Sequence, residues 1–128
     1  MPLTDSGSPT REEATNTKVS PFEVWLVRFT FLDKPSVTKI RPAIALETSA
    51  PGQALAMVKV TSHAPRPAVL GELVLSDWKQ AGLLKPSCVR CSQQARIPLD
   101  FLLRPIGRLT PRDAHRLAAA LRELGAIE

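Results

Sequence analysis

Several residue types are scarce in this chain, and each scarcity excludes a class of protein. Aromatic residues make up only 5% of the sequence and tyrosine is absent, which argues against a platform of exposed rings for stacking nucleobases. There are two cysteines, too few for a disulfide-stapled secreted domain. No apolar run approaches the roughly 20 residues that cross a bilayer, and the polar N-terminus has no apolar signal segment. We therefore expect a soluble, cytoplasmic protein with no membrane partner.

What is present suits one folded, basic domain. The 128 residues are 44% hydrophobic, and a chain of that length buries roughly two-thirds of the surface it exposes when unfolded. The 17 lysines and arginines exceed the 12 acidic residues, and the sequence pI is about 9.8. The resulting positive field favours polyanionic partners such as nucleic acid.

The chain divides into a tail and a domain. Residues 1–20 are polar and contain few bulky apolar side chains, so the sequence predicts a disordered N-terminal tail, with the domain spanning residues 21–128. Alternating apolar residues and turn signals predict strands over residues 22–31, 43–46, 54–61, 73–75 and 88–91, with further segments at 97–102 and 103–109. The first of these is expected to be buried mainly on one side. Pro98 and Pro105 confine their segments to edges or kinks.

Two helices are predicted. A short one begins at Ser76-Asp77 and runs through Trp78 to Ala81. The C-terminal helix has Thr110 as N-cap and Pro111 at its first position, and apolar residues then recur at helical spacing. The fold class is thus mainly β (α+β): a small barrel with a short helix after the fourth strand and a C-terminal amphipathic helix.

The sequence gives little evidence for a metal site or a redox-active pair of cysteines. Cys88 and Cys91 form a single C-x-x-C pair, whereas a structural zinc site takes four ligands, so we interpret them as small buried residues. His115 is expected to be solvated, and His63 stands in a turn after a strand. The sequence shows no serine-hydrolase elbow, phosphate-binding glycine loop or zinc-protease motif.

Basic and hydroxyl residues instead gather where predicted strands begin and end. In a small barrel these ends converge on one rim, where such groups form a cleft able to bind a phosphodiester. The residues are Lys39, Arg41, Thr61, Ser62, His63, Lys85, Ser87 and Arg90.

The order of these segments resembles the PemK/MazF family, the toxin components of bacterial type II toxin–antitoxin systems. The resemblance runs from about residue 22 to the C-terminus. It is carried by Val24-Trp25-Leu26-Val27, Lys39-Ile40-Arg41-Pro42-Ala43, Val60-Thr61-Ser62, Leu75-Ser76-Asp77-Trp78, Leu84-Lys85-Pro86-Ser87 with Val89-Arg90, and Ile106-Gly107-Arg108-Leu109.

The resemblance implies an SH3-like barrel that forms a homodimer. It also implies an endoribonuclease that cuts single-stranded RNA at short motifs without a metal or other cofactor. In that chemistry the ribose 2′-hydroxyl attacks phosphorus and leaves 2′,3′-cyclic phosphate and 5′-hydroxyl ends. The family's arginine falls on Arg41, which would stabilise the pentavalent phosphate, and its strand-end threonine falls on Thr61, which would donate a hydrogen bond to a phosphate oxygen. The remaining rim residues, with Gln93, would contact RNA.

One departure concerns the proton acceptor. Some family members carry V-R-C-D-Q, whereas this chain has Ser92 in the aspartate's place. Glu23, His63 and Arg41 remain as alternative general bases. The resemblance further implies a cognate antitoxin whose acidic segment would cover the RNA groove, which suits a basic toxin electrostatically.

Two other functions stay open. One is a barrel that binds nucleic acid without cutting it. The other is a gyrase-poisoning toxin of the same architecture, which the presence of Arg41 and Thr61 disfavours.

Overall fold

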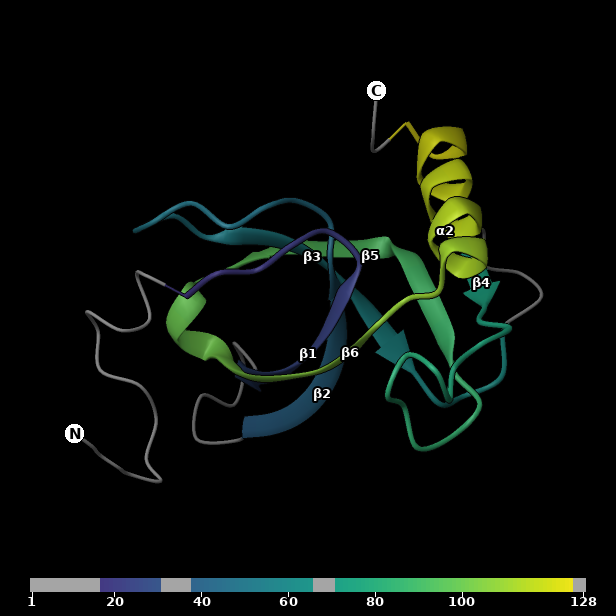
Figure 1. The fold of residues 1–128 in the computed structure, drawn as a ribbon, viewed down its shortest axis with the longest axis horizontal. Helices are drawn as coiled ribbons and strands as arrows, with labels where there is room; N and C mark the ends of the chain where they lie inside the picture. Colours follow the sequence, from purple (N-terminus) through teal and green to yellow (C-terminus); the bar gives the residue numbers. More distant parts are fainter. Residues whose placement is uncertain (1–16, 31–37, 66–70, 126–128) are drawn as a thin grey trace.

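A computed structural model describes residues 17–30, 38–65 and 71–125. Six strands form one antiparallel sheet in the order β4-β5-β3-β2-β1-β6, and one α-helix follows it (Figure 1). Within these ranges no helix is long and apolar enough to cross a bilayer. The elements are β1 (Glu23–Thr30), β2 (Thr38–Ala45), β3 (Leu55–Thr61), β4 (Glu72–Val74), β5 (Cys88–Ile97), the 3-10 turn η1 (Leu99–Phe101), β6 (Leu102–Arg108) and α2 (Pro111–Glu123).

The mainly β architecture is confirmed, and the barrel expectation is met in part. The sheet is strongly curved, while its pairing runs from one edge strand, β4, to the other, β6 (Figure 1). Strand β3 coincides with the predicted segment 54–61, but β2 begins earlier than predicted and β5 continues to Ile97. Pro105 lies in an edge strand, as expected, because β6 pairs with β1 alone among the described strands.

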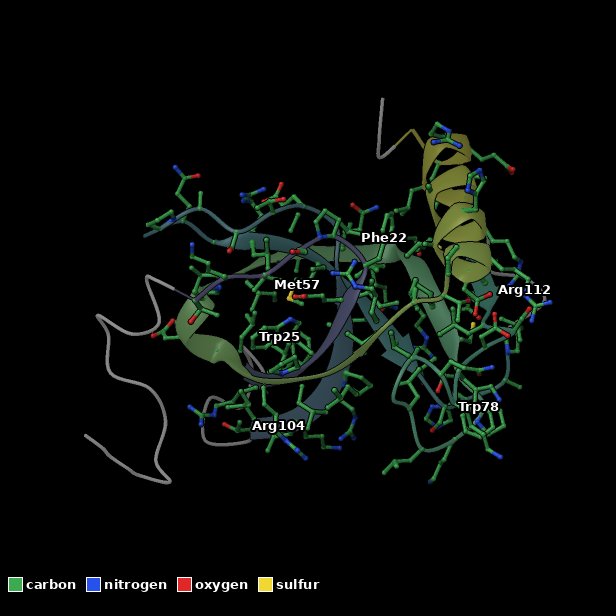
Figure 2. The ribbon with its side chains drawn as sticks, in the orientation of Figure 1. Phe22, Trp25, Met57, Trp78, Arg104 and Arg112 are labelled. Atoms are coloured by element: carbon green, nitrogen blue, oxygen red, sulfur yellow. The ribbon has the colours of Figure 1, made fainter. Side chains whose placement is uncertain are left out.

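The sheet is buried on both faces. Its inner face, the concave one, carries Trp25 and Met57, whose side chains point into the space that the sheet encloses (Figure 2). Its outer face carries Val24, which packs in one cluster with Leu117 and Leu121 of α2.

On the outer side of β1 only Val24, at the start of the strand, is fully buried, while Leu26 and Arg28 are half-buried. Trp25 and Val27 are buried on the inner side, which agrees with the prediction of a strand buried mainly on one side.

The predicted start of the C-terminal helix is confirmed. The Thr110 hydroxyl accepts a hydrogen bond from the Asp113 N–H at 3.4 Å, and Pro111 is the first helical residue. Gly125, with a φ of +74°, follows the last turn.

The short helix predicted at Trp78 is wrong. The segment after β4 consists of hydrogen-bonded turns, in which Ala81 N donates to the Asp77 carbonyl and Leu83 N donates to the Trp78 carbonyl. So few residues do not repay the cost of helix nucleation, and Gly82 leaves the helical region with a φ of +90°. The short 3-10 turn of this fold is η1, after β5.

The packed chain begins before the predicted domain boundary at residue 21. Val19 is 2% exposed and joins the inner-face cluster. Its N–H donates to the Ser49 hydroxyl at 2.8 Å, and that hydroxyl donates to the Thr17 carbonyl at 2.9 Å. Residues 17–20 therefore contact the body, whereas residues 1–16 lie outside the described part of the chain.

Gly107 is the point where β6 meets the turn after β4. A Cβ added there would overlap the Ala81 carbonyl oxygen, and one added to Gly82 would overlap the Ile106 carbonyl oxygen. Backbone atoms cannot rotate away as a side chain can. The I-G-R-L segment therefore needs glycine for a close backbone approach.

We expect Gly107→Ala to lower the free energy of unfolding by about 1–3 kcal/mol, the usual cost of overpacking. Urea unfolding measures it. Gly52→Asn is the control, because open space surrounds that turn position and asparagine tolerates its positive φ. Equal stability of Gly107→Ala and the wild type would show that the two backbones separate easily.

Candidate active site

Arg41 and Thr61 stand at corresponding positions of two neighbouring strands. Strands β2 and β3 are antiparallel, and their last hydrogen-bonded pair is Ala43 with Lys59. The β2–β3 pairing ends there, and the same register continued by two residues would bring Arg41 opposite Thr61. Residues two apart in a strand point to the same side of a sheet. Both side chains therefore leave from the inner face, where Arg41 also pairs with Val27 of β1.

The Arg41 side chain is exposed and makes only a local contact in the described structure, from Nη1 to the neighbouring Ile40 carbonyl at 3.0 Å. A surface salt bridge with Asp33 or Glu47 is the structural role that would compete with catalysis, and Asp33 lies outside the described residues. Glu47 instead pairs with Arg96 at 3.1 Å and accepts from the Ala56 N–H at 3.2 Å. The guanidinium thus keeps most of its planar array of donors for a ligand.

Thr61, Ser62 and His63 form a tight turn at the end of β3. The Thr61 hydroxyl accepts a hydrogen bond from the His63 N–H at 3.2 Å and lies 3.0 Å from His63 Nδ1. Serine and threonine hydroxyls commonly close such turns. Ser62 and His63 are exposed, so a hydroxyl and an imidazole are presented to solvent at this end of β3.

The other predicted rim residues differ in how available they are. Lys39 is exposed on β2, opposite Phe29 of β1, and Lys85 is exposed in the loop before β5. Ser87 is only 8% exposed and donates its hydroxyl to the Lys85 carbonyl at 2.8 Å. It therefore fixes the loop that carries Lys85.

Arg90 and Gln93 belong to an irregular part of β5. The β3–β5 register jumps from Val58 paired with Gln94 to Lys59 paired with Arg90, so residues 91–93 form a bulge. Arg90 Nε lies 3.6 Å from Glu72 Oε2 and has no hydrogen-bond partner among the described residues. Gln93 is half-buried. Bulges redirect side chains beside many active sites.

Sequence reasoning missed Lys59. Residues 55, 57 and 61 share its side of β3, and Leu55 and Met57 are buried there, yet Lys59 is exposed and its ammonium lies 5.1 Å from the centre of the Phe29 ring. The signal was a lysine at a position where the strand's alternation calls for an apolar side chain.

Both cysteines are buried, as the interpretation of the C-x-x-C pair predicts. Burial, with a smaller contribution from the Cys88 thiol, raises the pKa of Cys91 to about 11. The thiol is therefore protonated at neutral pH and a poor metal ligand. No group of three or more histidine, cysteine, aspartate or glutamate side chains in the described ranges is arranged to hold a metal ion.

A hydrogen-bond network ties the turn after β4 to the start of α2. Asp77 accepts from the Thr110 hydroxyl at 2.6 Å and from Arg112 Nε at 3.1 Å. These contacts, Arg112 first and Thr110 second, lower the pKa of the Asp77 carboxyl below its usual 3.8. The network anchors the segment that leads to Lys85 and β5.

The lowered pKa of Asp77 predicts a pH dependence of stability. A carboxyl whose pKa falls on folding stabilises fully above its unfolded-state pKa, and this contribution is lost as pH falls through the folded-state pKa. The Tm of the wild type should therefore exceed that of Asp77→Asn at pH 6, and the difference should shrink below about pH 4. Thermal unfolding between pH 6 and pH 2 tests this, and a gap that stays constant to pH 2 would contradict it.

Solved structures share this fold at low sequence identity. An endoribonuclease from a mycobacterial species matches with a TM-score of 0.62 and 15% identity, over 85% of this chain and 93% of that chain. The Mycobacterium tuberculosis toxin MazF-mt6 matches with a TM-score of 0.58 and 23% identity, over 83% and 98%. The MazE–MazF structure from Deinococcus radiodurans gives a TM-score of 0.63 and 14% identity, over 86% and 98%.

A search of curated protein sequences gave no match. A family model does match, the one described as PemK-like, MazF-like toxin of type II toxin-antitoxin system, and it covers residues 20–125. That range includes every motif on which the resemblance was based. The chain therefore belongs to the PemK/MazF-like toxin family of type II toxin–antitoxin systems.

Proposed function

We propose that this chain is a sequence-selective endoribonuclease that cleaves single-stranded RNA without a metal ion, as the toxin of a toxin–antitoxin pair. The observation that carries the proposal is the β2–β3 register, which leads Arg41 toward Thr61 on the inner face. Structural relatives include two endoribonucleases from mycobacterial species, which supports the same activity.

In the proposed reaction the ribose 2′-oxygen attacks the adjacent phosphorus. The new bond closes a 2′,3′-cyclic phosphate, the bond from phosphorus to the 5′-oxygen breaks, and the leaving oxygen takes up a proton to become a 5′-hydroxyl. Negative charge accumulates on the non-bridging oxygens. Arg41 offers a planar pair of N–H donors that matches these oxygens, and Thr61 offers one O–H donor. Donors aimed at developing charge stabilise the transition state more than the ground state.

Two of the three candidate general bases differ in their contacts. Glu23 accepts from Ser20 N–H at 3.0 Å and from Trp25 Nε1 at 3.1 Å, and it pairs with Arg108. It stands four residues along β1 from Val27, the partner of Arg41, which is about 13 Å at the rise of a strand. His63, in contrast, contacts the Thr61 hydroxyl directly. We therefore favour His63 over Glu23 as the proton acceptor, with Arg41 as the alternative.

The other proposed contacts with RNA are assigned mainly from the exposure of each side chain. Lys39, Ser62 and His63 surround the Arg41 position and would bind the RNA backbone there. Lys85, Arg90 and Gln93 would extend the groove across β5, and Ser87 would act by holding the Lys85 loop.

Cleavage of a long RNA by the purified protein in EDTA tests the proposal. We expect discrete fragments that carry 5′-hydroxyl ends, and mapping those ends gives the recognised motif. Intact RNA that shifts in a gel would instead identify a nucleic-acid-binding module, the second candidate, which Ser92 favours because it replaces a carboxylate. Intact RNA with no shift would refute both. Poisoning of gyrase would then be the remaining candidate.

Replacing Thr61 by valine should reduce cleavage about 10- to 100-fold, because the variant keeps the branched shape and loses the donor. The Tm should change by only a few degrees, since the hydroxyl is at the surface. Thr48→Val, in the exposed loop between β2 and β3, is the matched control. Full activity of the Thr61 variant would remove this hydroxyl from the site.

We also propose two protein partners. Relatives have been crystallised with a cognate antitoxin, and the exposed cations of the inner face suit an acidic antitoxin segment. A homodimer is the second, as the family implies. A cellular RNA substrate agrees with the cytoplasmic location expected from the sequence.

A further inference from the structure

We propose that Lys59 binds the backbone phosphate next to the one that is cleaved, and so fixes the position of the RNA strand along the groove. This inference rests on the proposed nuclease function and adds a residue to it. The contact would come from the side-chain ammonium, which is exposed although the strand on either side of it is largely buried.

The position of Lys59 follows from the strand register. It pairs with Ala43, two residues from Arg41, and lies two residues before Thr61 on the same side of β3. Diagonal neighbours in antiparallel strands are about 7–8 Å apart. Lys59 is thus close to Arg41 and Thr61, but its side chain starts two residues further along the sheet. An adjacent phosphate of the same RNA strand would lie there.

The charges around Lys59 make an anion favourable there. Lys59 and Arg90 are directly opposite each other on β3 and β5, an arrangement in which like charges repel. Glu72 is opposite Arg90 on the other side and pairs with it at 3.6 Å. The three residues that face one another across β3, β5 and β4 are therefore two cations, Lys59 and Arg90, and one carboxylate, Glu72. That carboxylate already pairs with Arg90.

The side chain of Lys59 extends away from Arg90. Its ammonium lies 5.1 Å from the centre of the Phe29 ring, and Phe29 pairs with Lys39 across β1 and β2. Since Lys39 and Ala43 flank Arg41 on β2, the side chain of Lys59 spans the part of the inner face that contains Arg41. The attraction between an aromatic ring and an exposed ammonium is weak. The ammonium of Lys59 could therefore leave the Phe29 ring and bind a phosphate with little loss of free energy.

The test combines a protein change with a substrate change. The substrate is a short RNA that contains the mapped cleavage motif, with 2′-O-methyl nucleotides at the flanking positions. Neutral methylphosphonate linkages replace the flanking phosphates one at a time. For the wild type, we expect one adjacent linkage at which this neutralisation lowers kcat/KM about tenfold. Lys59→Gln should lose about tenfold on the normal RNA and nothing further at that linkage.

Lys79→Gln is the matched control. Lys79 is also an exposed lysine whose ammonium lies over an aromatic ring, 5.8 Å from the centre of Trp78, but it belongs to the turn after β4. Lys59→Met is a second variant that keeps the apolar stem over Phe29, and Lys59→Arg should restore most of the activity. The logarithmic salt dependence of binding should become shallower by about 0.7 in Lys59→Gln and stay unchanged in Lys79→Gln.

The outcomes separate this inference from the proposed function. If the wild type cuts RNA and Lys59→Gln responds to every neutral linkage as the wild type does, Lys59 binds no backbone phosphate and the nuclease assignment stands. If the wild type neither cuts nor binds RNA, the proposed function fails and the Lys59 inference fails with it.

Discussion

Replacing Arg41 by alanine should lower the rate of RNA cleavage by about a thousandfold or more. The guanidinium would supply paired donors to a phosphate that gains negative charge in the transition state, and the removal of one such donor typically costs 10²- to 10³-fold. Single-turnover cleavage of an RNA that contains the mapped motif measures the effect. Stability should change by less than about 0.5 kcal/mol, because the side chain is exposed and bonds only to the adjacent carbonyl.

Arg104→Ala is the matched control for this experiment. Arg104 is an exposed arginine of β6 that pairs with Leu26, whereas Arg41 pairs with Val27, so the two arginines belong to opposite faces of the sheet. Arg41→Lys provides a graded case, since it keeps the charge and loses the planar array of donors, and we expect intermediate activity. Equal loss in Arg41→Ala and Arg104→Ala would mean that Arg41 contributes only general positive charge.

Replacing Asp113 by alanine should have the largest effect on stability. The side chain is fully buried and accepts from Ser76 N–H at 3.1 Å, from Asp77 N–H at 2.7 Å and from Arg116 Nη1 at 2.8 Å. The variant leaves two backbone donors unpaired and Arg116 without its carboxylate. We expect a loss of about 3–5 kcal/mol in the free energy of unfolding. For a domain of this size, Tm would fall by roughly 10–20 °C.

Thermal and urea unfolding test this prediction. Asp113→Asn should cost less, because its amide keeps the shape and one acceptor oxygen. Glu123→Gln, an exposed carboxylate near the end of the same helix, should change stability by less than about 0.5 kcal/mol. A similar small change in Asp113→Ala would show that solvent or a rearranged turn satisfies the two N–H groups.

Local patterns were sufficient for most of the elements. The N-cap and proline at residues 110–111 identified the start of α2, because capping depends on residues within one turn. Alternation identified β1 and β3 closely. The same reasoning failed at Trp78, where a short helical pattern has too few residues to propagate, and at β5, whose polar second half follows a bulge.

The role of Asp113 was visible in the sequence only in part. Its place in the first turn of a helix is a local feature, and a carboxylate there is favoured by the helix dipole. Its bonds to Ser76 and Asp77 join residues more than 30 positions apart, and no local pattern encodes them. The same is true of Lys59, because its cationic neighbour Arg90 comes from β5 and its aromatic neighbour Phe29 comes from β1.

The sequence by itself determined the chemistry that this protein carries: the arginine before a proline, the threonine at a strand end, the excess of positive charge and the order of motifs that identifies the family. Those features are local or compositional, so they can be recognised without a three-dimensional structure. Only the tertiary structure decided which of these groups share a face, because strand register and sheet curvature are set by contacts between distant segments. It also decided that the Ser87 hydroxyl bonds within its own loop, that Glu23 stands four residues from the β1 partner of Arg41, and that Lys59 pairs with Ala43, two residues from Arg41.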